Sequence, residues 1–345
     1  MKKNLTNDSP IDFVVLWCDS SDSDWLHKMA YWKEKLCGEK VDIDAARYRD
    51  WGIFKYWFRS IEKYAPWVRK VHLVTNGQVP DFLDLSNSKI QLVVHKDFME
   101  SSTIPTFNSH AIEMQIPYIE GLAEQFVYFN DDMFLVDYVE PEHFFQNGKR
   151  VELFCERSFL RYYDSIFYRI IATDRREFNF FVDGKKREYI KRNIGFRKWF
   201  SFRLPVSYWL SNSFYYIFSN RFAGFSIEHG PSVFLKSECF EVISQFNNIY
   251  KKTINDKFRG PNQINQYLFM YWSILKGNYV VDKSAGCCFF EINDVKRIEK
   301  GFKKGFKYPE ICLNDSSHIE DFDGTRKKII SILDKWLPEK SSFEK

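Results

Sequence analysis

Short hydrophobic β-strand patterns alternate with helical patterns through the first 136 residues, and this alternation restricts the fold more than any other feature of the chain. The pattern predicts strands at 11–17, 71–77, 90–95 and 125–136. It predicts helices at 50–65 and at 106–123, the second opened by Asn108 or Ser109 and bent at Pro117. Two further helices are expected at 261–277 and 325–337. Strands that alternate with helices form a mostly parallel sheet covered on both faces. We therefore predict an α/β fold with a Rossmann-like sheet.

Residues 151–226 interrupt this pattern with a basic and aromatic segment. Eight basic residues lie between 185 and 203 against one acid, Glu188, and aromatic residues are dense from Phe196 to Phe218. Such a composition is typical of a segment that lies on an anionic membrane surface. The alternative is an aromatic subdomain core with a solvated basic face. We predict three parts: an α/β half (1–150), this insertion (151–226) and a C-terminal part that completes the α/β domain (227–345).

Composition and targeting signals limit the class of protein. The formal charge of the 345-residue chain is only +4, which argues against a nucleic-acid partner. The polar start MKKNLTNDSP gives no secretory signal, and no run of apolar residues is long enough to span a membrane. The seven cysteines form no C-x-x-C pair, which indicates a reducing compartment and no structural zinc site. The expected location is the cytoplasm.

Adjacent carboxylates at the end of a hydrophobic strand are the first candidate for chemistry. Asp131 and Asp132 follow FVYFN, and paired carboxylates suit Mg²⁺ or Mn²⁺ that also contacts phosphate oxygens. A turn or a helix cap is the alternative. Asp19 follows the first strand and could bind a ribose or base, or form a plain Asx turn.

Four further candidates occur in the second half of the chain. His229, beside a Gly-Pro turn, is a candidate general base or a structural histidine. Arg259, just before a helix, is a candidate phosphate ligand or a surface arginine. Asp294 and Asp315 each follow a strand-like run, and either could bring another carboxylate to the site.

Four blocks of sequence then carry a resemblance. They are IDFVVLWCDSSDSDW (11–25), a long block from 47 to 135 that includes IPTFNSHAIE (104–113), EHGPSVFLKS (228–237), and KFRGPNQINQYLFMYWSILKG (257–277) followed by ICLNDSS (311–317) and LPEKSSFEK (337–345). In these blocks and their order the chain resembles the Stealth family. These are sugar-1-phosphate transferases of microbial capsule and cell-surface polysaccharide synthesis, together with the catalytic subunit of animal N-acetylglucosamine-1-phosphotransferase. The chain departs from the family pattern at Cys18, Ser20, Trp51 and Gln263, the last standing where an Asp is expected.

The resemblance implies transfer of a hexose-1-phosphate from a UDP-sugar to a sugar hydroxyl of a lipid-linked surface-polysaccharide intermediate, with release of UMP. It implies that residues 1–150 bind the nucleotide-sugar, that 151–226 contact the acceptor or the membrane, and that 227–345 complete the catalytic domain. It implies a glycosyltransferase-A-like sheet and Mg²⁺ or Mn²⁺ on Asp131 and Asp132. Arg259 with Lys236 would hold the phosphate, while Asp19 and Asn108 would line the donor pocket. His229 would accept the acceptor's proton, assisted by Asp315.

Two other functions remain open from the sequence. A metal-dependent glycosyltransferase would use the same donor and metal but release UDP. A non-catalytic carbohydrate-binding protein would suit the 35 Phe, 19 Tyr and 10 Trp but would need neither the carboxylate pair nor Arg259.

Overall fold

The computed structural model describes residues 9–19, 22–38, 50–153, 155–156, 187–219, 224–225, 229–260, 262–316 and 319–345. Its main sheet has five strands in the order β3-β2-β1-β4-β8. β1, β2, β3 and β4 are parallel, and β8 joins β4 in the antiparallel sense. The predicted α/β fold with a mostly parallel sheet is therefore confirmed. The strands of this sheet are β1 (Ile11–Leu16), β2 (Lys70–Thr75), β3 (Ile90–Val94), β4 (Gln125–Asn130) and β8 (Ser232–Leu235).

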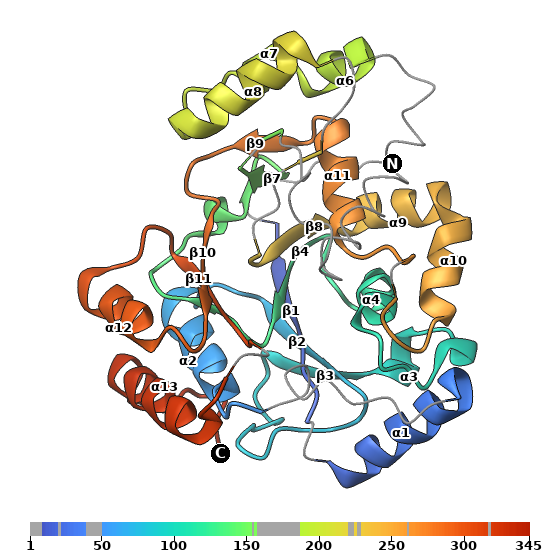
Figure 1. Cartoon of the computed structure of the whole chain (residues 1–345), viewed down its shortest axis with the longest axis vertical. Coiled ribbons are helices and arrows are strands. Elements are labelled where there is room, and N and C mark those ends of the chain that lie inside the picture. The colour runs from blue at the N-terminus through green and yellow to red at the C-terminus, as the bar shows by residue number, and fades with distance from the viewer. Residues whose placement is uncertain are drawn as a thin grey trace.

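Helices cover both faces of this sheet because successive residues of β1 point to opposite sides. Phe13 and Val15 belong to the hydrophobic core under α2 (Phe54–Tyr64) and α13 (Phe322–Trp336). Val14 belongs to the core on the other face. That face carries α4 (Ser109–Glu113), α9 (Lys236–Gln245), α10 (Asn247–Asn255) and α11 (Tyr267–Leu275). Figure 1 shows these two groups on either side of the sheet.

Two small sheets and the remaining helices complete the described structure. One sheet has the order β10-β11-β5, with β10 (Cys287–Glu291), β11 (Glu310–Asn314) and β5 (Met133–Leu135). The other has the order β6-β7-β9, with β6 (Phe145–Gln146), β7 (Lys149–Glu152) and β9 (Tyr279–Val281). The other helices are α1 (Ser23–Cys37), α3 (His95–Phe98), α6 (Arg187–Ile194), α7 (Phe196–Trp199), α8 (Val206–Phe218) and α12 (Val295–Lys304).

Three predicted elements differ from the structure. The helix expected over 261–277 is α11, which runs only from Tyr267 to Leu275. The helix expected over 106–123 is α-helical only at Ser109–Glu113, followed by a 3-10 turn at Ile116–Tyr118, since Pro117 lacks the N–H that a longer helix needs. The strand expected over 125–136 is two strands, β4 and β5, which belong to different sheets. Asp131 and Asp132 form the turn between them.

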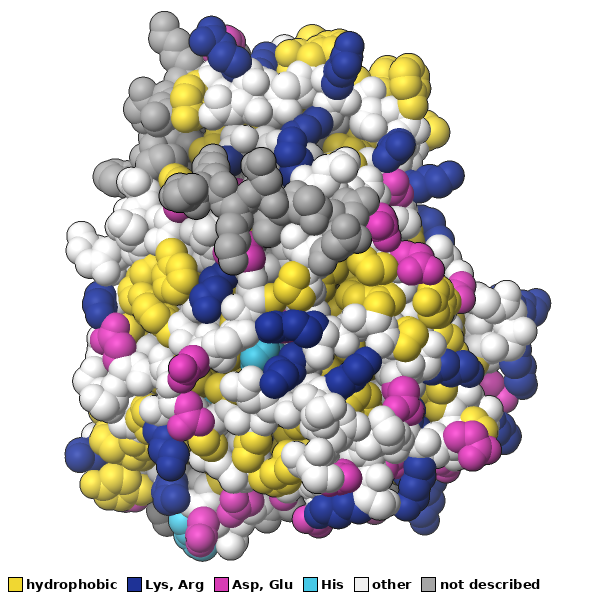
Figure 2. All heavy atoms as spheres, turned by 180° about the vertical axis from the view of Figure 1, so that it is seen from behind, with side chains coloured by type: hydrophobic (Ala, Val, Ile, Leu, Met, Phe, Trp, Pro, Cys, Tyr) yellow, Lys and Arg dark blue, Asp and Glu magenta, His cyan; other side chains and the backbone are white. Residues whose placement is uncertain are grey.

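The predicted division into three parts stays a prediction. Its boundary at 150 falls inside β7, and β8 from the third part completes the main sheet of the first. Much of the predicted insertion lies outside the described residues, but 187–219 form α6, α7 and α8 at one end of the molecule (Figure 1). At that end, Figure 2 shows hydrophobic side chains exposed beside lysine and arginine side chains.

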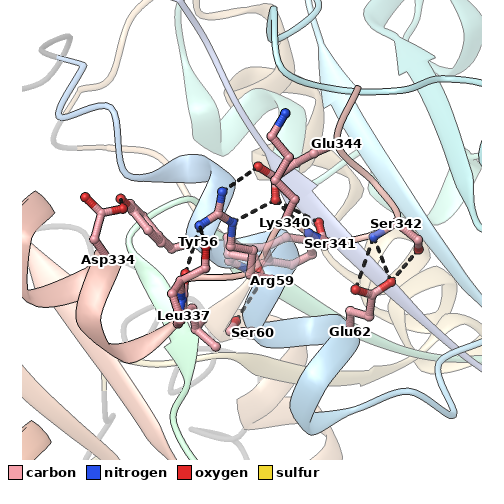
Figure 3. A network of polar contacts seen from close by, with 12 residues as sticks. Tyr56, Arg59, Ser60, Glu62, Asp334, Leu337, Lys340, Ser341, Ser342 and Glu344 are labelled. Atoms are coloured by element: carbon pink, nitrogen blue, oxygen red, sulfur yellow. Dashed lines mark hydrogen bonds and ion pairs between the residues drawn. The ribbon is translucent and has the colours of Figure 1, made fainter.

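The C-terminal residues are tied to α2 by a buried ion pair (Figure 3). Arg59 donates from Nε and Nη2 to the two carboxylate oxygens of Glu344, each at 2.8 Å, and from Nη1 to the carbonyl of Leu337 at 2.8 Å. Glu62 accepts from the backbone N–H of Ser342 at 3.0 Å. The terminal block LPEKSSFEK therefore closes the core between α2 and α13.

Candidate active site

Asp131 and Asp132 lie where β4 ends, and the sheets around them bring in further groups. β11 pairs antiparallel with β5, so the backbone N–H of Leu313 donates to the carbonyl of Asp132 at 2.9 Å. The same pairing places the thiol of Cys312 3.5 Å from Oδ2 of Asp132. Asp315 follows β11 directly, and its charge raises the pKa of Asp132.

The electrostatics of this pair favour a bound cation. The pKa of Asp131 is raised to about 7, first by desolvation and then by the carboxylates of Asp132 and Asp50. The pKa of Asp132 is also raised, mainly by desolvation, although His229 opposes the shift. Oδ1 of Asp132 is buried and has no hydrogen-bond partner. A divalent cation would relieve the repulsion between these carboxylates and use the unpaired oxygen, so the residues fit a metal.

His229 reaches this place because β8 runs antiparallel to β4. The register pairs Tyr128 with Ser232, so the residues before β8 lie near the end of β4. Asp132, His229 and Cys312 have ligand atoms within 4.8 Å of one another and could also hold a metal together. Nδ1 of His229 lies 3.4 Å from the hydroxyl of Tyr267. Gly230 allows this turn to approach β10, since a Cβ there would lie 2.5 Å from Cβ of Cys287.

The imidazole of His229 is suited to accept a proton. Desolvation lowers its pKa, the charge of Asp132 raises it, and that of Arg259 lowers it, with a net decrease. The ring is therefore neutral at neutral pH and faces both a carboxylate and a guanidinium. This is the electrostatic environment expected of a general base.

Arg259 is held by residues on α4 and by its own loop. Its Nη2 donates to Oγ of Ser109, the first residue of α4. Its charge opposes the desolvation that raises the pKa of the buried Glu113. Tyr128 connects this carboxylate to the end of β4, because its hydroxyl donates to Oδ1 of Asn130 at 2.7 Å and lies 3.3 Å from Oε1 of Glu113.

Asn108 and Gln263 fix the loop that carries Arg259. Asn108 is fully buried; its Oδ1 caps α4 and its Nδ2 donates to the carbonyl of Asp256 at 3.0 Å and to Oε1 of Gln263 at 3.2 Å. Nε2 of Gln263 donates to Asp256 at 3.0 Å and to the carbonyl of Phe258 at 2.8 Å. At the position where an Asp was expected, Gln263 thus joins α4 to the Arg259 loop.

Asp19 lies near the carboxylate pair. Desolvation and then the charges of Asp131, Asp19 and Asp22 raise the pKa of the Cys18 thiol, so Asp19 and Asp131 both lie near this side chain. Gln78 fixes the segment, because its Nε2 donates to the carbonyl of Asp19 at 2.9 Å and to Asp22 at 2.7 Å. Asp22 caps α1.

Lys236 is the predicted site residue that the structure does not bring to this place. β8 ends where β4 begins, and the backbone N–H of Lys236 donates to the carbonyl of Glu124 at 2.8 Å. Its Nζ donates to the carbonyl of Ile119 at 3.2 Å, and its charged neighbours are Glu124 and Asp12. Lys236 therefore lies at the end of the sheet opposite Asp131 and Asp132. Asp294 caps α12, accepting from the N–H of Arg297 at 3.3 Å, whereas Asp315 lies close enough for its charge to raise the pKa of Asp132.

A cavity of about 50 Å³ adjoins the site beyond Gly230 and Tyr267. Arg150, Glu152 and Glu310 contribute to its lining. It has room for a few water molecules but not for a sugar ring. Substrates would therefore occupy the open ends of the strands, where ligands of parallel α/β sheets collect.

Sequence reasoning missed Glu113, Tyr128, Asp50 and Cys312. Glu113 is the last residue of the block IPTFNSHAIE. That block contributed to the family resemblance, but no role was assigned to its glutamate. Tyr128 and Asn130 are two residues apart on one strand, a spacing that places both side chains on the same face. No sequence signal places Cys312 next to Asp132, because their proximity arises from the pairing of β5 with β11.

Carboxylates, an imidazole and a guanidinium lie at the strand ends of an α/β sheet, which is where such sheets bind their ligands and place their active sites. Similar protein sequences identify the family. Residues 47–153 match the family profile described as Stealth protein conserved region 2. The chain is 36% identical over 343 residues to the capsular polysaccharide phosphotransferase WcwK of Streptococcus pneumoniae, which covers 99% of this chain and 100% of that protein. The chain therefore belongs to the Stealth family.

Two further relatives have comparable extent. The exopolysaccharide phosphotransferase cps2G of Lactiplantibacillus plantarum is 36% identical, covering 97% of this chain and 96% of that protein. The receptor polysaccharide phosphotransferase WefC of Streptococcus oralis is 34% identical, covering 97% of this chain and 99% of that protein. Among solved structures, the galactosyltransferase LgtC with donor and acceptor sugar analogs aligns at a TM-score of 0.41 and 10% identity, covering 96% of this chain and 98% of that chain.

Proposed function

We propose that this protein transfers a hexose-1-phosphate from a UDP-sugar to a hydroxyl of a bacterial surface-polysaccharide intermediate and releases UMP. The relatives named above are polysaccharide phosphotransferases, which supports transfer of a sugar phosphate to a polysaccharide. The observation that carries the proposal is the convergence of Asp132, His229 and Arg259. The acceptor is carried on a lipid, and the enzyme acts at the cytoplasmic face of the membrane.

The reaction is an in-line displacement at the β-phosphorus of the donor. The acceptor oxygen bonds to that phosphorus, and the bond from the phosphorus to the bridging oxygen breaks, so UMP leaves with the bridging oxygen. His229 takes the proton of the attacking hydroxyl, which its lowered pKa permits at neutral pH. Asp315 orients the acceptor beside Asp132.

Arg259 stabilises the negative charge on the transferred phosphate. Its guanidinium is held by Ser109 and by the loop that Asn108 and Gln263 fix, so it does not have to be ordered during the reaction. Asp131 and Asp132 would hold Mg²⁺ or Mn²⁺, which neutralises diphosphate charge when bound. Asp19, which lies near Asp131 beside Cys18, would bind the nucleoside end of the donor.

The nucleotide product tests the proposal. Purified protein is incubated with a panel of UDP-sugars, Mn²⁺ or Mg²⁺, and a saccharide acceptor, and the products are separated by anion exchange. UMP with a phosphodiester-linked product supports the proposal. UDP with a glycosidic product would establish the metal-dependent glycosyltransferase, and sugar binding without turnover would establish a carbohydrate-binding protein.

A chelator and a pair of variants sharpen this experiment. EDTA should stop UMP release, and added metal should restore it. Arg259→Gln should lower kcat by about 100- to 1000-fold, the usual effect of removing a group that stabilises transition-state charge. Lys236→Gln is the matched control, since that cation lies at the opposite end of the sheet.

A further inference from the structure

Helix α8 (Val206–Phe218) presents its apolar side to solvent. Its sequence, VSYWLSNSFYYIF, contains no charged residue. Five of its apolar side chains are between 57% and 75% exposed: Val206, Leu210, Phe214, Ile217 and Phe218. They recur at helical spacing, so they form one continuous face, with Trp209 at 38% exposure along its edge.

The opposite side of α8 is fixed to the body of the protein by polar groups. The fully buried Asn212 donates from Nδ2 to the carbonyl of Trp199 at 3.2 Å and accepts from the N–H of Glu156 at 2.7 Å. Oγ of Ser211 donates to the carbonyl of Glu156 at 2.9 Å. Trp199 is itself completely buried and contacts the ring of Tyr216. The polar side of α8 therefore faces inward, the reverse of the usual arrangement in a soluble protein.

Cations accompany this apolar face. From 188 to 219 the sequence has five basic residues and one acidic residue. Arg192, Arg197 and Arg203 are exposed, although Arg203 also pairs with Asp282 at 3.4 Å, and Phe196 and Phe202 are exposed in the same segment. Lys198 is used inside the protein, where it donates to the carbonyl of Gly277. Among the described residues, no helix is long and apolar enough to cross a bilayer.

We propose that the exposed face of α8, with Arg192, Arg197 and Arg203, docks on the surface of an anionic lipid bilayer, with the helix lying in the plane of the headgroups. The apolar face of α8 would contact the boundary of the acyl chains, and the arginines would contact the anionic headgroups. This proposal rests on the proposed function in one respect: lipid docking by α8 would bring the active site to an acceptor carried on a lipid.

Flotation with lipid vesicles tests the surface. Wild-type protein is mixed with vesicles of phosphatidylcholine alone, or of phosphatidylcholine with phosphatidylglycerol, and the bound fraction is measured across a salt series. Wild-type protein should bind the anionic vesicles and lose binding as salt rises. Leu210→Ser with Ile217→Ser should weaken binding about tenfold per side chain. Leu36→Ser is the matched control, because Leu36 is an equally exposed leucine on α1.

The charge contribution is measured separately. Arg192→Gln with Arg197→Gln should weaken binding to anionic vesicles about fivefold per charge. Lys327→Gln with Lys328→Gln, on α13, removes the same charge elsewhere and should leave binding unchanged. Circular dichroism confirms that all variants are folded.

Three results would overturn the proposal: wild-type protein that does not float with anionic vesicles, α8 variants that float like wild type, or a solution dimer that Leu210→Ser with Ile217→Ser converts to monomer. The last would make α8 an interface between two copies. UMP release with a water-soluble acceptor is measured in parallel, so failure of lipid docking and failure of the proposed reaction are distinguished.

Discussion

The ion pair between Arg59 and Glu344 allows the stability of the C-terminal closure to be tested quantitatively. The two side chains are only 7% and 3% exposed and share two hydrogen bonds of 2.8 Å. Glu344→Gln leaves the guanidinium buried without its counter-charge. Breaking one side of a buried pair costs about 3–5 kcal/mol. Because the glutamine oxygen can still accept one of the two bonds, we expect the lower end, about 3 kcal/mol.

The assay is urea unfolding followed by tryptophan fluorescence. At a slope of about 3 kcal/mol per M, the expected loss lowers the midpoint by about 1 M. Glu100→Gln is the control, because its pair with Lys251 is 41% and 47% exposed and such a surface pair contributes at most about 1 kcal/mol. If Glu344→Gln lost no more free energy of unfolding than Glu100→Gln, the buried pair would not be what holds the terminal residues.

The pH dependence gives a second check on the same pair. Burial alone would raise the pKa of Glu344, but hydrogen bonds from Arg59 and Ser341 outweigh it, so the pKa is lowered. A lowered carboxyl pKa contributes stability above the unfolded value of about 4.3, and this is lost as pH falls through the folded pKa. The difference between wild type and Glu344→Gln should therefore be constant at neutral pH and shrink in acid.

Four further predictions concern the site. Asp132→Asn should raise the metal concentration needed for half-maximal activity by 100-fold or more, and normal metal dependence with near-normal turnover would refute its assignment. Since the pKa of Asp131 is raised to about 7, protons compete with the cation below that pH, and the half-maximal metal concentration should rise by about tenfold per pH unit there. Gln263→Ala should lower kcat in the same direction as Arg259→Gln, measured as initial UMP release, because the loop loses its tie to α4. Lys236→Gln should leave kcat within about threefold; a loss comparable to that of Arg259→Gln would contradict its place at the far end of the sheet.

The strands of the main sheet were predictable because their signals are local. The runs at 11–16, 70–75 and 90–94 are short, rich in β-branched residues and bounded by turns, and they formed within one or two residues of the prediction. The helix at 106–123 was overestimated because a periodic apolar pattern does not show where Pro117 interrupts the hydrogen bonding. The turn at Asp131 and Asp132 was missed because apolar residues flank it on both sides, and the sequence does not show that these two runs join different sheets.

For the candidate site too, the residue types were predictable from the sequence but their proximity was not. Asp131, Asp132, His229 and Arg259 could be named from residue type, local context and family resemblance. Their proximity could not, since it depends on β8 running antiparallel to β4 and on β11 pairing with β5. The same antiparallel register places Lys236 at the opposite end, although only six residues separate it from His229 along the chain.

By itself, the sequence determined the alternating α/β pattern, the carboxylates that end its strands and the family to which the chain belongs. Only the tertiary structure decided which of those polar residues meet, because strand direction and register, rather than sequence distance, set which ends of the strands are neighbours. It also decided that the uncharged helix α8 turns its apolar side outward. That direction depends on the buried contacts of Asn212 with Trp199 and Glu156, which are distant in sequence and invisible in composition.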